Sequence, residues 1–302
     1  MKLLMVGAGA IGGYFGGRLV EKGEDVTFLV RERRRKQLEE TGLHIRSIHG
    51  DFQTTPTLIQ AGEIAGPFDA VLLSMKAYQL DQAIEDIRPY VGENTMIIPL
   101  LNGIAHMDRL IAAFGEENVL GGLCFVEATL NEQGHIIQSS GTHDFIFGER
   151  SGERSERVSR LEDTFSNTKS NFVLSETILA DMWKKYLFIS TLSGVTSLYR
   201  SPIGPIRDDE YGSKTVKKTL TEAAAIMKSL DAPLPDGVEE ANWDKLHDIE
   251  HTMKSSLQRD MEKGLSVEGD HFFGYLLEKA DEQGIPAPTL ETIYANLRVY
   301  EN

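Results

Sequence analysis

The stretch "VGAGAIGG" (Val6–Gly13) decides the fold, because it places three glycines in the order G-x-G-x-x-G between an apolar strand pattern and a helical pattern. The first glycine allows a tight turn, the second lets the backbone approach a pyrophosphate, and the third permits close packing of helix on strand. The helix N-terminus then faces the phosphate charge. The candidate cofactor-binding residues of this turn are Gly7, Ala8, Gly9, Ala10, Ile11 and Gly12. The alternative is a glycine-rich turn without a ligand, which the strand–turn–helix context disfavours.

The first half of the chain alternates between strand and helix patterns. The expected strands are residues 2–6, 25–30, 69–75 and 95–102, and the expected helices are residues 10–22, 33–40 and 78–90. Such alternation indicates βαβ units and a parallel sheet. Two extra strands are expected between residues 43 and 58. Further strands are expected over residues 118–147, with turns at "NEQG" (131–134) and "SSGTHD" (139–144).

From residue 177 onward the pattern is helical. The expected helices are residues 177–195, 209–230, 238–263, 271–284 and 289–300, with breakers at "SPIGP" (201–205), "APLPDG" (232–237) and "GIPAP" (284–288). We therefore expect an α/β fold. An N-terminal Rossmann-type domain with a doubly wound, mainly parallel sheet (residues 1–175) precedes an all-helical C-terminal domain (residues 176–302).

Composition and charge exclude several classes of function. The 302 residues are 41% hydrophobic and 25% charged, which is typical of a globular protein, and the net charge of −15 argues against nucleic acid or an anionic membrane surface as a partner. A single cysteine, Cys124, cannot form a disulfide framework, which fits a reducing compartment. No apolar run reaches the roughly 18 residues of a membrane span, and the N-terminal run of about 4 is too short for a signal peptide. We expect a cytoplasmic protein.

The end of the second expected strand indicates which cofactor is preferred. An NAD site usually has an acid there, which binds the ribose hydroxyls. Here "FLV" is followed by Arg31, and an arginine can pair with a phosphate that an acid would repel. We therefore prefer NADP(H), with Arg31 as the main contact. The alternative is that Arg31–Lys36 is only the solvated start of a helix, and this is the simpler interpretation for Arg33, Arg34 and Arg35.

Two more polar residues follow expected strands. Lys76 comes just past the third strand in "LLSMKAYQ", and Asn102 comes just past the fourth in "IIPLLNG". In open parallel sheets the ligand lies at the carboxyl ends of the strands, so we expect both residues at the same edge as Gly9 and Arg31. Taken singly, Lys76 could be a surface residue and Asn102 part of an ordinary turn.

At this point the chain resembles the ketopantoate reductase (2-dehydropantoate 2-reductase) family over essentially its whole length. The matching segments are "GAGAIG" (7–12), Arg31, "MKAYQ" (75–79), "NG" (102–103), "WKK" (183–185) and "SLQRDMEKGLSVEGD" (256–270). The resemblance implies an N-terminal Rossmann domain, a helical C-terminal domain and an active site in the cleft between them. It also implies NADPH-dependent reduction of 2-dehydropantoate to (R)-pantoate in pantothenate biosynthesis.

The resemblance further implies roles for single residues. Lys185 would be the proton donor. Lys76 and Asn102 would lie at the nicotinamide and the substrate. Ser256 and Glu268 would lie on the substrate and ribose side, which makes Glu268 a cofactor-binding and Ser256 a substrate-binding candidate. The last two also have structural explanations. A carboxylate such as Glu268 in a first helical turn stabilises the helix N-terminus, and Ser256 in the middle of an expected helix could simply face solvent.

Two positions depart from the family pattern. Family members have asparagines one and two helical turns after the catalytic lysine, where they bind the substrate, whereas this chain has Ile189 and Ser193. Replacing an amide by isoleucine removes a hydrogen-bond partner and adds an apolar wall. Ile189 and Ser193 stay candidate substrate-binding residues, but the identity of the 2-oxo acid is open. A paralogous NADPH-dependent reductase of another 2-oxo acid is therefore an alternative.

The adjacent lysines of "DMWKKYLFIS" (Asp181–Ser190) have different surroundings on an expected helix. The stripe that contains Lys185 at spacings of four and three is otherwise apolar, and it comprises Ile178, Met182, Ile189 and Leu192. The stripe of Lys184 is mostly polar, and Asp181 can pair with Lys184 at i, i+3. Burial would lower the pKa of Lys185 towards the range that is useful to a general acid. The alternative is that Lys185 extends its ammonium to solvent along apolar surface.

We therefore expect an NADP-dependent oxidoreductase that acts on a small-molecule 2-oxo acid. A hydride from NADPH goes to the ketone carbon, while Lys185 protonates or hydrogen-bonds the oxygen. The histidines lack metal-ligand spacing, so we predict no metal. The oligomeric state is open, with a homodimer as one option. The rivals are a 3-hydroxyacid dehydrogenase of the 6-phosphogluconate type, whose glycine-rich substrate segment is not evident here, and a non-catalytic NADPH-sensing protein, which would not need a lysine in its cleft.

Overall fold

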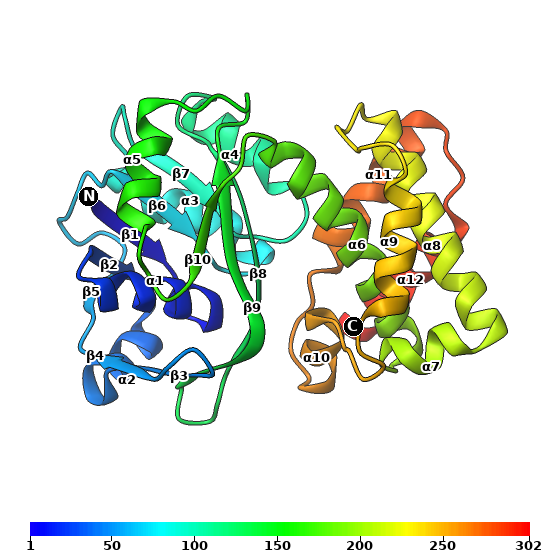
Figure 1. The fold of residues 1–302 in the computed structure, drawn as a ribbon, viewed down its shortest axis with the longest axis horizontal. Helices are drawn as coiled ribbons and strands as arrows, with labels where there is room; N and C mark the ends of the chain where they lie inside the picture. Colours follow the sequence, from blue (N-terminus) through cyan, green and yellow to red (C-terminus); the bar gives the residue numbers. More distant parts are fainter. The chain divides into compact units, whose positions relative to one another are not determined.

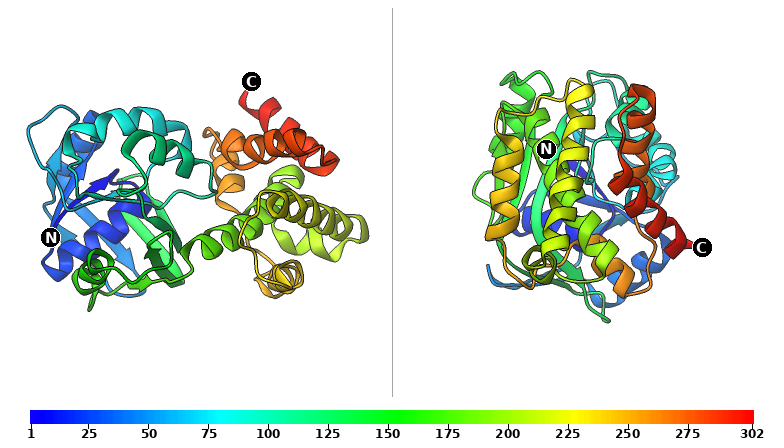
Figure 2. Two further views of the ribbon diagram at one scale, coloured as in Figure 1. Left: turned by 90° about the horizontal axis from the view of Figure 1, so that it is seen from above. Right: turned by 90° about the vertical axis from the view of Figure 1, so that its right-hand side faces the viewer.

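The computed structural model describes residues 1–302 and divides into two compact units. The first unit comprises Met1–Leu101 and His106–Ile178, and the second comprises Asn102–Ala105 and Leu179–Asn302. Figures 1 and 2 show strands and helices in the first unit, coloured blue to green, and helices in the second, coloured green to red. The expected α/β class with a helical C-terminal part is confirmed.

Five strands of the first unit form a fully parallel sheet. They are β1 (Lys2–Val6), β2 (Asp25–Leu29), β5 (Thr57–Ile59), β6 (Ala70–Leu73) and β7 (Met96–Pro99), in the order β5-β2-β1-β6-β7. The four residues of β6 and of β7 are all buried, as expected for apolar strands that are covered on both faces. The strand order reverses between β1 and β6, and such a switch point is where open parallel sheets bind ligands.

Helices and short turns connect these strands. They are α1 (Ala10–Lys22), α2 (Glu32–Thr41), the 3-10 turn η1 (Ala77–Gln79), α3 (Leu80–Ile87), the 3-10 turn η2 (Arg88–Tyr90) and α4 (His106–Phe114). The helix expected over residues 78–90 is therefore three consecutive pieces, because Pro89 cannot donate the backbone hydrogen bond that a continuous helix requires. The sequence pattern does not predict α4.

A second, mixed sheet completes the first unit. It consists of β3 (Leu43–Ser47), β4 (Phe52–Thr54), β8 (Gly121–Leu130), β9 (Ile136–Gly148) and β10 (Asn171–Leu174), in the order β10-β9-β3-β4 with β8 paired to β9. α1 packs against strands of both sheets. Gly16 allows this close packing, since a Cβ there would lie 2.7 Å from the ring of Phe28. Where two strands are expected between residues 43 and 58, the structure has three, β3, β4 and β5. The third of them, β5, does not belong to the mixed sheet and pairs with β2.

The turn expected at residues 139–144 is wrong. These residues belong to β9, and residues 139–142 form a bulge between the pairs Ala128↔Gln138 and Val126↔His143. The Ser140 hydroxyl accepts a hydrogen bond from the Glu127 amide at 2.9 Å, so a side chain satisfies the backbone inside the strand. The turn expected at residues 131–134 is confirmed, because the Gly134 amide donates to the Asn131 carbonyl at 2.9 Å.

An aromatic core lies behind the second sheet. Its rings meet edge-on or tilted, and they belong to Phe15, Phe145, Phe147, Phe165 and Phe172. Phe165 comes from α5 (Glu156–Phe165), whose N-terminus is capped by the Ser155 hydroxyl. Apart from Phe145–Phe147 within β9, each of these contacts joins a helix to β9 or β10, so the core holds the mixed sheet and its covering helices together.

The second unit is helical. Its elements are α6 (Ile178–Tyr199), α7 (Ile203–Asp208), α8 (Glu210–Ser229), α9 (Val238–Asp248), α10 (Ser256–Glu262), the π-helical turn η3 (Asp270–Gly274), α11 (Tyr275–Gln283) and α12 (Pro288–Glu301). The "SPIGP" segment is not only a breaker, because α7 starts within it. Pro205 lies in the first turn of α7, where its missing amide hydrogen costs no hydrogen bond.

The single helix expected over residues 238–263 is also wrong. α9 ends at Asp248, and α10 starts anew at Ser256. The Ser255 hydroxyl accepts a hydrogen bond from the Gln258 amide at 3.1 Å and so caps a new helix N-terminus. Ser256 therefore stands at the start of a helix rather than in the middle of one. None of the helices in either unit is both long enough and apolar enough to cross a bilayer.

Candidate functional site

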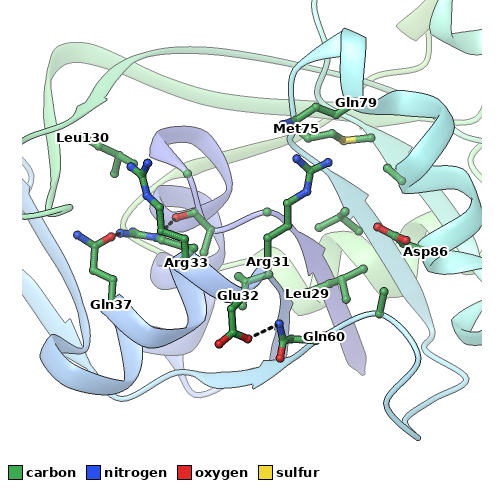
Figure 3. A pocket seen from close by; sticks show the side chains of 18 residues that line it. Leu29, Arg31, Glu32, Arg33, Gln37, Gln60, Met75, Gln79, Asp86 and Leu130 are labelled. Carbon is green, nitrogen blue, oxygen red and sulfur yellow. Dashed lines mark hydrogen bonds between the residues drawn. The ribbon is translucent and has the colours of Figure 1, made fainter.

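A pocket of about 550 Å³ opens at the carboxyl ends of the parallel strands of the first unit. Its walls come from residues 6–9 after β1, residues 29–34 at the junction of β2 and α2, residues 60–61 after β5, and Met75 and Gln79 after β6. Figure 3 shows these side chains around the pocket. The position is the one that the strand order predicts for a ligand site.

The glycine turn has the geometry that its spacing predicts. Gly7 has φ = +91°, a conformation that other residues rarely adopt. A Cβ at Gly12 would collide with the Ser74 hydroxyl and the Gly7 carbonyl, so only glycine permits this helix–strand distance. A Cβ at Gly9 would meet no atom within 4 Å, which leaves the backbone there open to a ligand. The open backbone at Gly9 thus gives the turn room for a dinucleotide pyrophosphate.

Of the predicted turn residues, three line the pocket directly. They are Gly7, Ala8 and Gly9. The other three, Ala10, Ile11 and Gly12, form the first turn of α1 next to them. The first turn of a helix presents backbone amides and a partial positive charge, so these residues can contribute through the backbone without side-chain contact.

Arg31 also lines the pocket, with an exposed side chain at the N-cap position of α2. Figure 3 shows its guanidinium extending toward Met75 and Gln79. The neighbouring Glu32 points the other way, where its carboxylate lies 2.9 Å from the Lys36 ammonium and accepts a hydrogen bond from Gln60 at 3.0 Å. These partners lower the pKa of Glu32 from its ordinary value. Glu32 also lines the pocket, but its carboxylate is paired with Lys36 and Gln60, whereas the Arg31 guanidinium extends over the pocket.

The structure adds residues that the sequence pattern assigns to a solvated helix start. Arg33 and Arg34 both line the pocket, together with Gln37 of α2 and Leu130 at the end of β8. Arg34 is half-buried, and burial lowers the pKa of its guanidinium from the ordinary value. The expectation of a solvated side chain is thus wrong for Arg34, because the β8–β9 hairpin folds against α2 at this point. Arg35 is paired instead with Glu39 and Glu63.

Lys76 occupies the N-cap position of η1, three residues after the end of β6 at Leu73. Its neighbours Met75 and Gln79 line the pocket, whereas Lys76 itself does not. Its location after a parallel strand agrees with the sequence-based placement at the carboxyl edge of the sheet. A role for Lys76 toward a nicotinamide or a substrate stays a prediction.

The remaining predicted site residues lie in the second unit. Lys185 is on α6 and is only 8% exposed, which is unusual for a lysine. The predicted stripe around it is buried at Ile178, Met182 and Leu192 and half-buried at Ile189. By contrast, the side chain of Lys184 is 48% exposed and its ammonium lies 3.6 Å from the Asp181 carboxylate. The predicted difference between the two lysines and the predicted ion pair are both confirmed.

A buried pair of hydroxyls joins α6 to the start of α10, near Ser193 and Ser256 in sequence. Ser193 lies two turns after Lys185 on α6 and is 3% exposed. One turn further on, the Thr196 hydroxyl lies 2.8 Å from the hydroxyl of Ser255, the residue that caps α10. Ser256, the first residue of α10, is exposed. This hydrogen bond holds the start of α10 against α6, the helix that carries Lys185 and Ser193.

Asn102 is anchored by a histidine that the sequence analysis does not single out. The imidazole Nε2 of His271 lies 2.6 Å from the Asn102 carbonyl, and a Cβ at Gly103 would lie 3.1 Å from the same nitrogen. His271 belongs to η3, which is held to α6 by the Tyr186 hydroxyl, a donor to the Phe272 carbonyl at 2.5 Å. Burial raises the pKa of Tyr186 well above its ordinary value, so this donor stays protonated.

Glu268 lies just before η3, and its carbonyl accepts a hydrogen bond from the Phe272 amide at 3.0 Å. Gly269, the residue at the N-cap position of η3, has no side-chain cap. Glu268 therefore stands at the start of the helical segment that contains η3, and both its explanation as a carboxylate at a helix N-terminus and its role toward a cofactor stay predictions. π-Helical turns such as η3 are frequent at functional sites.

The predicted site residues are thus divided between the two units. The first unit contains the glycine turn, Arg31 and Lys76, and it gathers the turn and Arg31 around one pocket. The second unit contains Asn102, Lys185, Ile189, Ser193, Ser256 and Glu268. Chemically, the first set can bind a dinucleotide phosphate, and the second offers a buried lysine with hydroxyl and amide groups for a polar substrate.

Two family models match the two parts of the chain. The family model described as Ketopantoate reductase PanE/ApbA matches residues 3–152, and the model for the C-terminal part of the same family matches residues 177–301. The chain is 48% identical over 301 residues to an uncharacterized oxidoreductase of Bacillus subtilis (strain 168), YkpB, with 100% of this chain and 99% of the relative covered. It is 28% identical to a 2-dehydropantoate 2-reductase of Mesorhizobium japonicum, with 99% and 97% covered.

Solved structures show the same fold. A 2-dehydropantoate 2-reductase from Geobacter metallireducens GS-15 superimposes with a TM-score of 0.89 at 27% identity, and 99% of each chain is covered. A D-mandelate dehydrogenase in a ternary structure with NADH and anilino(oxo)acetate has a TM-score of 0.89 at 21% identity, with 100% of this chain and 98% of the other covered. At this low identity, the similarity to the D-mandelate dehydrogenase concerns the fold alone.

Proposed function

The chain belongs to the ketopantoate reductase family of oxidoreductases, and we propose that it reduces a 2-oxo acid to a 2-hydroxy acid with NADPH as the cofactor. The substrate that the relatives support best is 2-dehydropantoate, with (R)-pantoate as the product and a place in pantothenate biosynthesis. The proposed domains are an NADP-binding domain over residues 1–175 and a substrate domain over residues 176–302.

The observation that carries the cofactor proposal is the side chain that faces the pocket at the end of β2. Arg31 extends over the pocket while Glu32 is engaged by Lys36 and Gln60, so a positive charge stands where NAD sites have an acid. A guanidinium binds phosphate by charge-assisted hydrogen bonds, whereas ribose hydroxyls offer it no charge. This geometry favours the 2′-phosphate of NADPH.

Lys185 is the residue that we propose for proton transfer. A bound nicotinamide would supply the hydride that reduces the ketone carbon. As negative charge develops on the carbonyl oxygen, an ammonium donor stabilises it and delivers the proton. Lys185 suits this role because it is the buried lysine of α6, whereas Lys184 is exposed and paired. Asn102 and Ser256 are the polar groups that we propose for orienting the substrate.

Ile189 and Ser193 are the residues that we propose to set the selectivity among 2-oxo acids. A half-buried isoleucine and a buried serine offer one hydroxyl and no amide at these two turns of α6. We therefore propose that 2-dehydropantoate is used less well than by an asparagine-bearing relative and that another 2-oxo acid competes. The fold itself does not decide the substrate, since the D-mandelate dehydrogenase has it as well.

The decisive experiment is NADPH oxidation with a panel of 2-oxo acids, including 2-dehydropantoate and more apolar analogues, with steady-state kcat/KM as the readout. Turnover of at least one of them with NADPH is the expected result. A clear preference for 2-dehydropantoate, with all others worse by more than about 10³-fold, would contradict the proposed role of Ile189 and Ser193. Binding of NADPH without turnover of any substrate would favour the sensor alternative.

A further inference from the structure

One side chain of the pocket joins three separate segments of the first unit. The Arg34 guanidinium, on α2, donates from Nε to the Ala8 carbonyl at 2.8 Å and from Nη1 to the Gly134 carbonyl at 2.9 Å. Nη1 also donates to Oε1 of Gln37 at 2.6 Å. Arg34 therefore connects the glycine turn, α2 and the hairpin turn between β8 and β9.

The bond to Ala8 bears directly on the phosphate-binding backbone. The Ala8 carbonyl and the Gly9 amide belong to one planar peptide unit, and in a trans peptide they point in opposite directions. When Arg34 holds the carbonyl, it also determines the direction of the Gly9 amide. Gly9 is the residue where a Cβ would meet no atom within 4 Å, so this is the amide that a phosphate can approach.

The bond to Gly134 holds a wall of the pocket in place. Gln37 reinforces it by donating to the Gln133 carbonyl at 3.0 Å. Gly134 has φ = +76°, and a Cβ there would collide with the Gln37 side chain, so the close contact depends on glycine. Leu130, the last residue of β8 before this turn, lines the pocket. Docking of the turn on α2 therefore sets where Leu130 stands.

The charge of Arg34 is unopposed, unlike the charges of Arg35 and Lys36. All three of its acceptors are neutral, whereas Arg35 pairs with Glu39 and Glu63 and Lys36 pairs with Glu32. Its Nη2 atom is buried without a hydrogen-bond partner. A half-buried cation with no anion is unfavourable on its own, and an anionic ligand in the adjoining pocket would offset the cost.

We propose that Arg34 is a positioning and specificity residue of the cofactor site. It holds the glycine turn and the 131–134 turn for any dinucleotide, and its unopposed charge adds to that of Arg31 in selecting the 2′-phosphate of NADPH over NADH. This inference rests on the proposed function. It differs from the direct contact assigned to Arg31, because Arg34 acts through the backbone that it holds and through its field.

The test separates the two contributions by titration calorimetry of NADPH and NADH against four variants. Arg34→Met removes both the hydrogen bonds and the charge. Arg34→Lys keeps the charge but cannot reproduce the fork. Gly134→Ala disturbs the docked turn and leaves every charge in place. Arg154→Met removes an exposed arginine that pairs with Glu162 and serves as the control for net charge. Chemical denaturation of each variant verifies that it folds.

We expect Arg34→Met to weaken NADPH by about 30-fold or more and NADH by only about 3- to 10-fold, since the charge term concerns the extra phosphate. Arg34→Lys should restore the NADPH/NADH ratio but not the loss common to both. Gly134→Ala should weaken both cofactors by the same factor, and Arg154→Met should weaken neither.

An unchanged NADPH/NADH ratio in Arg34→Met overturns the inference. So does wild-type binding of both cofactors by Gly134→Ala, provided that this variant folds. In either case wild-type preference for NADPH would leave the proposed function standing. If the wild-type protein itself binds NADH as tightly as NADPH, the proposed cofactor fails first and the inference falls with it.

Discussion

The Lys184 ammonium lies 3.6 Å from the Asp181 carboxylate, whereas Lys185, the next residue, is buried. Two identical side chains in sequence thus have different environments, because consecutive residues of a helix are separated by about 100° of rotation. The exposed pair on α6 contributes only a few tenths of a kcal/mol. Lys184 therefore has an ordinary structural explanation as an exposed, paired residue.

Lys185→Ala should lower kcat by about 10²- to 10⁴-fold, the usual contribution of acid–base catalysis, and leave NADPH binding largely intact. Lys184→Ala is the matched control, and it should cost little because it removes only an exposed ion pair. Steady-state kinetics and NADPH titration of both variants provide the measurement. The assignment is wrong if Lys184→Ala is the crippling change and Lys185→Ala keeps a near-normal kcat.

Arg31→Ala should weaken NADPH binding by about 1–3 kcal/mol, the scale of a lost charge-assisted hydrogen bond, and leave NADH nearly untouched. The physical reason is that Arg31 faces the pocket from the end of β2, where a 2′-phosphate would lie. Titration calorimetry measures both affinities. Equal affinities for NADPH and NADH in the wild-type protein would remove the basis of this prediction.

Thr196→Val should destabilise the second unit by about 1–2 kcal/mol, because the buried Ser255 hydroxyl loses its partner at 2.8 Å. Since this bond holds the capped start of α10, we also expect KM for the 2-oxo acid to rise more than kcat falls. Thr196→Ser keeps the hydroxyl and is the control. Denaturant unfolding and steady-state kinetics decide it, and loss of stability without any change in KM would show a purely structural bond.

A buried histidine of the mixed sheet, His143, should make the stability of the protein depend on pH. His143 is buried, stacks on His49 with ring centroids 3.7 Å apart, and shares a hydrogen bond with Tyr14 at 2.8 Å. Burial, followed by the charges of His49 and Arg18, lowers the pKa of His143, while Asp144 acts in the opposite direction.

The unfolded state therefore binds more protons than the folded state just below the ordinary histidine pKa of about 6.5. The stability that depends on a neutral His143 should be fully present above that pH. The free energy of unfolding should then fall as the pH drops through the folded-state pKa of His143. His143→Gln, which cannot titrate, should make this slope shallower, and His247→Gln on α9 is an exposed control. Denaturation curves at several values between about pH 5 and pH 8 provide the measurement. An identical slope in His143→Gln and the wild-type protein would contradict the assignment.

Local patterns were sufficient for the parallel core and its glycine turn. The bounds of β1 and α1 agree with the pattern to the residue, because buried apolar runs and a helical period are properties of neighbouring residues. The same holds for the contrast between Lys184 and Lys185, which depends only on helical spacing. Arg31 could be placed at the edge of the sheet because a parallel strand order puts every carboxyl end on one side.

What the sequence could not reveal are the features that long-range contacts decide. The polar run at residues 139–142 looks like a turn locally, but pairing of β9 with β8 makes it a bulge. Arg34 looks like a solvated residue of α2 until a hairpin turn one hundred residues later docks on it. The hydrogen bond between the His271 imidazole and the Asn102 carbonyl joins residues that are 169 positions apart in the sequence. Sequence patterning thus determined elements such as β1 and α1, the glycine turn and the buried lysine. Only tertiary structure decided the buried environment of Arg34 and the anchoring of Asn102, because burial and hydrogen-bond partners depend on segments that meet only in the folded chain.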